Sequence, residues 1–488
     1  MINFDEVPYE YYKPGTYIEA AANYDRAGLV AYPARALLMV QKLASGTAQA
    51  LQLYRITRPE QGAALFGVGS VGDDMVRAWK KANKTTDVYA IAQGDDAAGV
   101  AATGTFTFTG AGAGVVPLYI GNVRIPVKIT TGMTVTQMAT AAVSAIALRA
   151  GLPVTASSAA GVVTLTARHK GEVGNHISHA VARRIDDSMP TGIAVAVGAM
   201  ANGATNPDVQ DILDAIAAER FTDVVVPWDD SGTLDALADD FAARFTAMGR
   251  KDGGVFVGHR GTFGALTTKC AITNSPHITP IGADGMIEPP WVWASALGGV
   301  AAFQLTNDPA RQLRSLVLPG ITAPPSAALF TEDEQNLLLQ GGCSTFNALD
   351  DGAVTLDRVV TTYKMSPLGI TDHAWMDIMV PRVLTRIRYD WSAWTSLTYP
   401  RSKLADDDSI AASQDTDGVI VTPKRMLGSW GARCRLYAAR GWIENISDTL
   451  ARSRFERDDT DRNRLNGKQP ITIMGNLMIL AGRLEFDA

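Results

Sequence analysis

The spacing of apolar residues first predicts strands that are buried on both faces. Continuous apolar runs occupy residues 36–40, 88–92, 222–226 and 254–258. A helical stripe from Leu234 to Met248 separates the last two runs. Helices that alternate with uniformly apolar strands are typical of a parallel α/β sheet. We therefore expect these segments to form one α/β domain.

Two sites in this region carry signals for the start of a helix. Asp73 and Asp74 place negative charge at the beginning of a helix predicted over residues 73–79, where the helix dipole favours it. Asn206 is a candidate N-cap, with Pro207 at the first helical position. Both signals agree with the α/β interpretation.

Between residues 95 and 200 the composition shifts to alanine, glycine, threonine and valine. Residues 105–108, 123–129 and 163–166 alternate apolar and polar positions, which predicts half-buried strands. One helix is predicted at about 134–149. This stretch is interpreted as a mostly-β domain inserted into the α/β domain.

The last 120 or so residues have a third pattern, with long helical periodicity followed by short strands. Aromatic and apolar residues around Tyr437, Trp442 and Ile446 suggest strand and turn packing. Residues 471–480 and 483–486 are expected to be terminal strands. The predicted helix stripe consists of Trp375, Ile378, Met379, Val383, Leu384, Ile387 and Trp391.

The predicted fold class is therefore α/β and α+β, with several domains. It combines a central α/β domain, an inserted mostly-β domain and a C-terminal α+β domain with terminal strands. The expected parts are an N-terminal arm (1–33), the first part of the α/β domain (34–94), the inserted outer domain (95–200), the rest of the α/β domain (201–365) and the C-terminal domain (366–488).

Composition narrows the classes of function. The 488 residues carry a formal net charge of -6, which argues against a general nucleic-acid binder. Cys270, Cys343 and Cys434 lie far apart, as in a protein that is made in a reducing compartment. The acidic N-terminus lacks the features of a signal peptide, and no apolar run is long enough for a membrane-spanning helix. We expect no direct nucleic-acid contact and no membrane insertion.

The sharpest catalytic hypothesis is a serine hydrolase. Asp230-Ser231-Gly232 resembles the aspartate motif of subtilisin-like proteases, and the segment from His259 loosely resembles their histidine motif. A triad needs a nucleophile, a base and an orienting acid in mutual contact. The nearest third candidate, Ser344, lacks the residues that usually follow the catalytic serine. Asp230 also fits a plain N-cap, so no catalytic residue is assigned.

Other site patterns are weak. His169, His176 and His179 could suggest a metal, but a polar loop after a strand explains them better. The GxGxxG at residues 67–72 does not clearly follow a long buried strand, so a turn is the better interpretation. Arginines at 452–464 alternate with acidic residues, as on a solvated face. We expect no metal and no cofactor, and a structural role.

Three segments resemble the contractile-tail sheath family. Residues 14–19 (Pro-Gly-Thr-Tyr-Ile-Glu) are similar to its N-terminal element, although Thr16 replaces a common aliphatic residue. Residues 164–175 are similar to a segment of Mu-like phage sheaths. Residues 357–363, which precede the long helix, match the C-terminal order of the family. The resemblance covers most of the chain and implies a subtilisin-like fold in the α/β domain.

The resemblance also implies a function. Sheath subunits stack as hexameric rings in a helical sheath around the tail tube and contract to drive it through the host envelope during genome ejection. Terminal arms add strands to neighbouring subunits. The expected arm residues are Tyr17, Ile18, Glu19, Leu477, Met478, Ile479 and Leu480. The expected partners are further copies of the chain, the tail tube protein, and baseplate and tail terminator proteins, in a virion tail assembled in the host cytoplasm.

Alternatives remain open at this stage. The chain could be another virion assembly protein, or a degenerate or active α/β serine hydrolase. It could also belong to a tailocin or a secretion system. In the less favoured alternative, both termini pair within their own subunit instead of reaching a neighbour.

Overall fold

A computed structural model describes residues 13–16, 28–416 and 418–486, so the predicted arm residues Tyr17, Ile18 and Glu19 lie outside the described part. The chain divides into two compact units. The smaller unit comprises residues 1–31 and 389–472, and the larger comprises 32–388 and 473–488. Within the described ranges, no helix has the length and apolar character needed to cross a bilayer.

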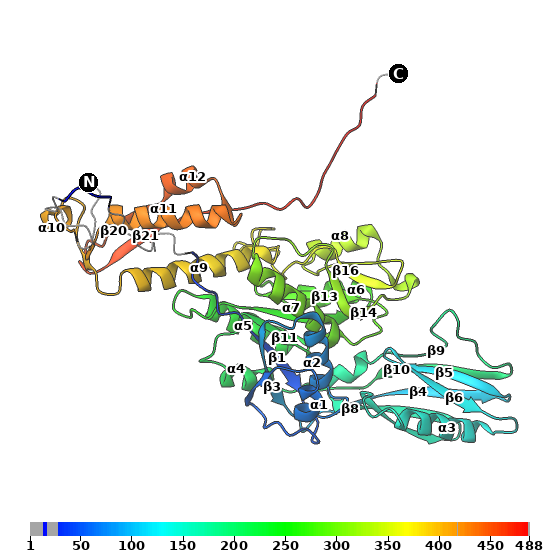
Figure 1. Cartoon of the computed structure of the whole chain (residues 1–488). Coiled ribbons are helices and arrows are strands. Elements are labelled where there is room, and N and C mark those ends of the chain that lie inside the picture. Colours follow the sequence, from blue (N-terminus) through cyan, green and yellow to red (C-terminus); the bar gives the residue numbers. More distant parts are fainter. Residues whose placement is uncertain (1–12, 17–27, 417, 487–488) are drawn as a thin grey trace. The chain divides into compact units, whose positions relative to one another are not determined.

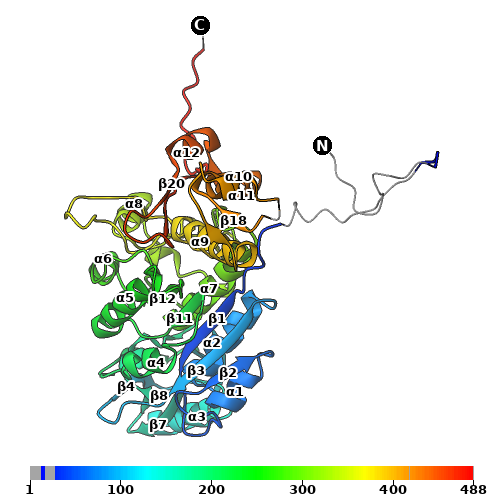
Figure 2. The same cartoon turned by 90° about the vertical axis from the view of Figure 1, so that its left-hand side faces the viewer.

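A six-stranded sheet forms the centre of the larger unit (Figures 1 and 2). Five strands run parallel, and β2 joins β3 in the antiparallel sense at one edge. The predicted parallel α/β sheet is therefore confirmed. The strands, in order across the sheet, are β13 (Ile278–Ala283), β12 (Gly254–Arg260), β11 (Asp223–Val226), β1 (Arg35–Gln41), β3 (Asp87–Gln93) and β2 (Leu53–Ile56).

Helices cover both faces of this sheet. Helices α2 and α7 pack together on one face, against β1, β11 and β12, while α4, α5 and α6 lie on the other (Figure 2). α7 is apolar around most of its circumference, and its fully buried Trp293 shows why, since a helix of this kind must be enclosed. The helices are α1 (Gln61–Phe66), α2 (Val71–Ala82), α4 (Val209–Ala215), α5 (Ser231–Phe245), α6 (Phe263–Ala271) and α7 (Pro290–Asn307).

Two antiparallel sheets and one helix form the inserted region between β3 and α4 (Figure 1). In β4, Phe106 and Phe108 face the core while Thr105 and Thr107 lie on the half-buried face, as their alternation predicts. Helix α3 (Val135–Ala147) begins with a capping box formed by Thr134 and Gln137. One sheet contains β10 (Ile193–Ala201), β4 (Ala101–Gly110), β8 (Val162–Lys170) and β7 (Val154–Ala159), and the other contains β6 (Val123–Ile129), β5 (Gly114–Ile120) and β9 (His179–Val181).

A small antiparallel sheet completes the larger unit. It orders β14 (Val317–Thr322), β16 (Ala353–Leu356) and β15 (Phe346–Ala348). Helix α8 (Glu332–Gln340) precedes β15 in the chain and also starts with a capping box, from Thr331 and Glu334. Two short 3₁₀ turns span Glu172–His176 and Ser326–Ala328.

The smaller unit is built around a buried charge. Asp390, which is almost fully buried, accepts hydrogen bonds from Arg433 (Nη2 to Oδ1, 2.5 Å), from the Tyr437 hydroxyl (2.7 Å) and from the backbone N–H of Val30 (2.7 Å). α9 (Met379–Thr398) contributes its second half to this unit. The other elements are β17 (Lys403–Leu404), α10 (Ile410–Ser413), β18 (Ile420–Val421), α11 (Pro423–Ala439), β19 (Ile443–Glu444), α12 (Ile446–Arg452), β20 (Arg454–Arg457), β21 (Leu465–Lys468) and β22 (Thr472–Ile473).

Some predicted element ends are wrong. The N-cap of α4 is Asp208 and not Asn206. The Asn206 side chain instead donates to the Asp230 carboxylate and accepts from the backbone N–H of Glu172. Met248 lies beyond the end of α5 and is exposed.

Two assignments near the C-terminus are also wrong. The long helix α9 starts at Met379, and Trp375 precedes it with its carbonyl bonded to Thr361. Tyr437 lies in α11 rather than in a strand or turn, and its ring packs against those of Trp430 and Trp442.

We expect Asp390→Ala to destabilise the smaller unit by about 3–5 kcal/mol, because it leaves the buried Arg433 guanidinium without its counter-ion. Urea denaturation followed by tryptophan fluorescence measures this change. The matched control is Asp448→Ala, which removes the exposed ion pair to Arg452 and should cost no more than about 0.5 kcal/mol. Equal effects of the two substitutions would contradict the importance of the buried pair.

Candidate functional site: the anchor of the C-terminal segment

The C-terminal segment combines a fixed backbone with uncovered side chains. Residues 474–486 pair with no strand among the described residues. Leu477, Ile479 and Leu480 are 70%, 80% and 85% exposed, and Leu484 and Phe486 are also exposed. Several exposed apolar side chains within one short segment are typical of a surface that another chain covers.

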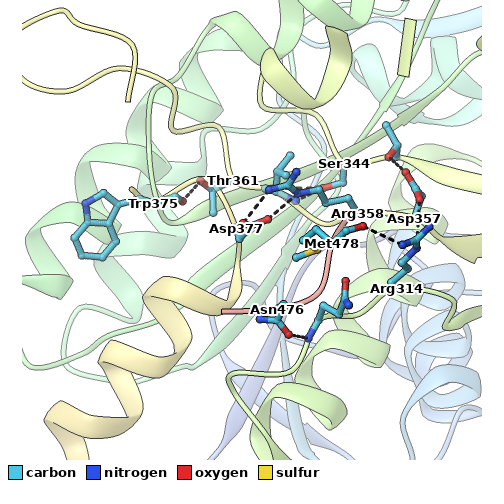
Figure 3. A network of polar contacts seen from close by, with 12 residues as sticks. Arg314, Ser344, Asp357, Arg358, Thr361, Trp375, Asp377, Asn476 and Met478 are labelled. Atoms are coloured by element: carbon cyan, nitrogen blue, oxygen red, sulfur yellow. Dashed lines mark hydrogen bonds and ion pairs between the residues drawn. The ribbon is translucent and has the colours of Figure 1, made fainter. Parts of the chain in front are cut away.

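Its first residues are held by a short segment between α7 and β14 (Figure 3). The Asn476 side chain donates to the carbonyl of Ala310 (2.8 Å) and accepts from the backbone N–H of Gln312 (3.2 Å). The Gln312 side chain donates to the carbonyl of Leu477 (3.1 Å), and Arg314 donates to the carbonyl of Met478 (3.2 Å). Met478 packs against the core of the larger unit. The backbone is therefore fixed up to Met478.

Arg314 extends the anchor into a network around the end of β16 (Figure 3). Its guanidinium approaches the Asp357 carboxylate at 4.0 Å, and Asp357 also accepts from the Thr345 hydroxyl at 3.0 Å. The adjacent Arg358 makes two hydrogen bonds to Asp377, at 2.9 and 3.0 Å. Asp377 lies two residues before α9. The network thus links the C-terminal segment to the stretch that leads into the long helix.

Of the predicted arm residues, only those at the C-terminus lie in the described part of the chain. Leu477, Met478, Ile479 and Leu480 are described and extended, but the strand predicted for them is absent, because no partner strand lies beside them in the described part. At the other end, Tyr32 marks where the chain enters the larger unit. Its ring lies under the guanidinium groups of Arg220 (5.0 Å) and Arg386 (4.5 Å), and its hydroxyl accepts from Arg220.

The protease-like residues form a different arrangement from the one predicted. Asp229, not Asp230, contacts His259, with Oδ2 3.0 Å from Nδ1. Asp229 also lies 3.6 Å from His176 and 3.2 Å from the Lys269 ammonium. Asp230 is the N-cap of α5, as the alternative interpretation predicted. Both Asp229 and His259 are buried, so no substrate reaches them in this structure.

The candidate serines do not complete a triad. The Ser344 hydroxyl is buried, donates to the Val360 carbonyl and accepts from the Val360 N–H. Its hydrogen-bonding groups are therefore engaged by the backbone of Val360. Ser231 is the first residue of α5. A nucleophile has to touch its base, and the structure gives neither serine a contact with His259.

The remaining weak patterns also have structural explanations. In the GxGxxG segment, Gly67 and Gly69 have φ of +94° and +75°, and Ser70 caps α2, so the glycines serve a turn as predicted. His169 bonds Asp95, whereas His179 bonds the Gly198 carbonyl. Among the described residues, no group of three or more histidine, cysteine or acidic side chains is arranged so that it could hold a metal ion. These histidines lie in or beside strands and a 3₁₀ turn, not in one polar loop.

Charge interactions explain the titration of the Asp229 cluster. Burial raises the pKa of the Asp229 carboxyl, but the nearby His176 and the hydrogen-bonded His259 outweigh it and hold that pKa well below its usual value. Burial lowers the pKa of His259, but the bond to Asp229 outweighs it and leaves the pKa raised. The cluster therefore acts as a buried ion pair that links β12 to the loop after β11.

Comparison with known proteins identifies the family. The model of the phage tail sheath protein central domain matches residues 202–362. The Mu-like prophage FluMu tail sheath protein of Haemophilus influenzae is 29% identical over 99% of both chains. Residues 202–362 therefore form a phage tail sheath central domain, and the whole chain is similar to a Mu-like tail sheath protein. The chain has the structural role of a contractile tail sheath protein and is a component of the virion tail.

Solved structures agree with this at the level of the fold. A sheath tail protein from Listeria innocua matches with a TM-score of 0.51 at 13% identity, covering 93% of this chain and 94% of that one. The anti-feeding prophage helical sheath in its contracted state also matches with a TM-score of 0.51, at 11% identity, covering 98% and 100%. The multidomain α/β and α+β fold class of the sheath protein is confirmed.

The sequence interpretation missed the residues that anchor the tail of the sheath protein. Gln312, Arg314 and Asn476 are polar residues in irregular segments, and no periodicity singles them out. The one available signal was Gly475-Asn476 directly before an apolar run. It does not reveal that Asn476 contacts a segment more than 160 residues away.

We expect Asn476→Ala to loosen the C-terminal segment, because it removes two hydrogen bonds worth about 0.5–1.5 kcal/mol each. The backbone N–H of Gln312 should then exchange with deuterium roughly tenfold faster, as measured by hydrogen-exchange mass spectrometry. The control is Asn463→Ala, at an exposed position of the β20–β21 loop. Unchanged exchange at Gln312 in Asn476→Ala would refute the anchor.

The Asp229–His259 pair predicts a dependence of stability on pH. Because the pKa of His259 is raised in the folded state, its contribution is complete below the unfolded pKa of ~6.5 and is lost as the pH rises through the folded value. The difference in unfolding free energy between the wild type and His259→Gln should therefore be larger at pH ~5.5 than at pH ~8.5. Urea titrations at both pH values measure it, and a constant difference would rule the ion pair out.

Proposed function

We propose that this chain polymerises as stacked hexameric rings around a tail tube and shortens to drive the tube through a host envelope. Its partners would be further copies of itself, the tail tube protein, and baseplate and tail terminator proteins. The observation that carries the proposal is the C-terminal segment, whose backbone is fixed up to Met478 and whose apolar side chains beyond it are uncovered.

The proposed contact between subunits is addition of a strand to a neighbour's sheet. Residues from Ile479 onward are extended, and their backbone groups have no strand partner among the described residues, so they are available for pairing. Each backbone hydrogen bond contributes a net 0.5–1.5 kcal/mol, so a short strand supplies on the order of a few kcal/mol per link. Tyr17, Ile18 and Glu19 are proposed as the matching arm at the N-terminus.

The β20–β21 hairpin is the proposed acceptor. It pairs four residues of each strand, from Arg454 opposite Lys468 to Arg457 opposite Leu465. It forms a two-stranded sheet, so within the described residues both of its outer edges are open. A two-stranded sheet gains stability when further strands join it. An arm from a neighbouring subunit would provide such a strand.

Contraction would then be a movement of rigid subunits about these links. Backbone pairing at the arms keeps neighbours connected, while each compact body keeps its own core. The inserted region from β4 to β10 is proposed to lie outside the contracting layer. No catalytic step is part of this function. The buried Ser344 and Asp229 support that view, and the hydrolase alternative is not favoured.

Two truncations test the arms. Removing residues 1–20, or ending the chain after Met478, should leave a folded subunit that fails to form sheaths when co-expressed with its tube and baseplate partners. The second truncation keeps the anchor but removes Ile479 and the apolar residues beyond it. Negative-stain electron microscopy shows whether striated tubes form, and circular dichroism checks folding.

The control is Leu148→Ser in the inserted region. It removes an apolar side chain that is 84% exposed and far from both termini in the sequence, and this variant should assemble as the wild type does. Sheaths of normal length from either truncation would overturn the proposed role of that arm.

A further inference from the structure

Two of the three cysteines share one small apolar cluster in the larger unit. Cys270 lies near the end of α6, and Cys343 follows α8. Both are about 1% exposed and pack with Leu266 and Leu338, in a cluster separate from the main core. The third, Cys434, is in the smaller unit.

The positions around Gly282 show how close the two thiols are. Leu266 and Cys270 are one helical turn apart and lie on the same face of α6. A Cβ atom at Gly282 would lie 2.8 Å from the Leu266 methyl groups and 3.2 Å from Cys343 Sγ. Cys343 Sγ therefore lies against the face of α6 that carries Cys270, and both thiols belong to the same small apolar cluster.

Positive charge surrounds the pair. Lys364 donates to the carbonyls of Cys270 (2.8 Å) and Thr273 (3.1 Å). The His259 imidazole interacts electrostatically with Cys270 from β12. The neighbouring Cys343 thiol, and then burial, raise the pKa of the Cys270 thiol well above its usual value, although His259 and Lys364 oppose this. The Cys270 thiol is therefore protonated at neutral pH while the cluster stays closed.

We propose that Cys270 and Cys343 form an oxidative modification site, where a peroxide converts the two thiols into one disulfide within the subunit. The thiols stay reduced where the chain is made and become oxidised when the particle meets oxidants outside the cell. The inference does not depend on the arms or on polymerisation.

The reaction balances with hydrogen peroxide as the oxidant. The first thiolate attacks one peroxide oxygen, the O–O bond breaks, and a sulfenic acid and water result. The second thiol then attacks the sulfenic sulfur, the S–O bond breaks, and a second water leaves. Two protein thiols lose two electrons, and one peroxide is reduced to two waters.

The disulfide would connect α6 to the segment that leads to the tail anchor. Cys343 is followed by Ser344, which bonds Val360, and by Thr345, which bonds Asp357 next to Arg314. A covalent link between Cys270 and Cys343 reduces the number of conformations that the unfolded chain can adopt. Oxidation should therefore raise the thermal unfolding midpoint of the subunit.

The experiment treats the folded full-length protein with hydrogen peroxide or with a phosphine reductant, and then denatures it in N-ethylmaleimide. We expect intact mass to show three alkylated thiols in the reduced protein and one in the oxidised protein. Trypsin should release residues 270–311 joined to 315–358, since neither range contains an internal cleavage site. Cys434 should remain alkylated in both samples.

Cys434→Ser should form the same cross-link and show the same rise in unfolding midpoint, whereas Cys270→Ser and Cys343→Ser should show neither. The wild-type peptide map alone decides the outcome if a variant fails to fold. Three alkylated thiols after peroxide, sulfinic or sulfonic acid at either position, or a cross-link that includes Cys434 would each overturn the proposal.

Discussion

The larger unit depends on backbone pairing of β1 with a strand on each side. Leu37 pairs with Tyr89 of β3 and with Val224 of β11, which lie far apart in sequence. β3 and β11 flank the same strand. The Gln93 side chain at the end of β3 donates to the Asp208 carbonyl at the start of α4, so the chain leaves and returns to the larger unit at neighbouring points. An entire region with its own two sheets can therefore be inserted between them without breaking the core. The Gln41 side chain, at the end of β1, bonds both Asp95 and the carbonyl of Lys170 and so holds the exit of that region.

The C-terminal segment differs from the central sheet, because its backbone is held in place while its apolar side chains stay exposed. Asn476 and Arg314 hold the backbone, while Ile479 and Leu480 expose their side chains to solvent. Exposed apolar surface carries a free-energy cost of roughly 25 cal/mol per Å² that burial in an assembly removes. The subunit therefore has a complete core but leaves the apolar side chains of its C-terminal segment exposed, as expected of a protein that polymerises.

Several residues that look catalytic in the sequence instead stabilise the fold. Asp229 and His259 form a buried pair, and the Ser344 hydroxyl bonds one backbone unit. A buried carboxylate must be paired because desolvation is costly, and pairing shifts its pKa just as a catalytic site would. Residue type and order along the chain therefore cannot separate a catalytic dyad from a buried ion pair.

The sequence by itself determined the strands that depend only on the pattern of apolar residues within one segment. Continuous apolar runs predicted β1, β3, β11 and β12, and period-two alternation predicted β4 and β8. Both predictions were possible because the order of apolar residues along a strand shows whether one or both of its faces are buried. Only the tertiary structure decided which acid meets His259, that Asn206 bonds Asp230 instead of capping α4, and that Asn476 anchors the tail. Each of these depends on contacts between residues far apart in sequence, and the pattern along one segment carries no information about what packs against it.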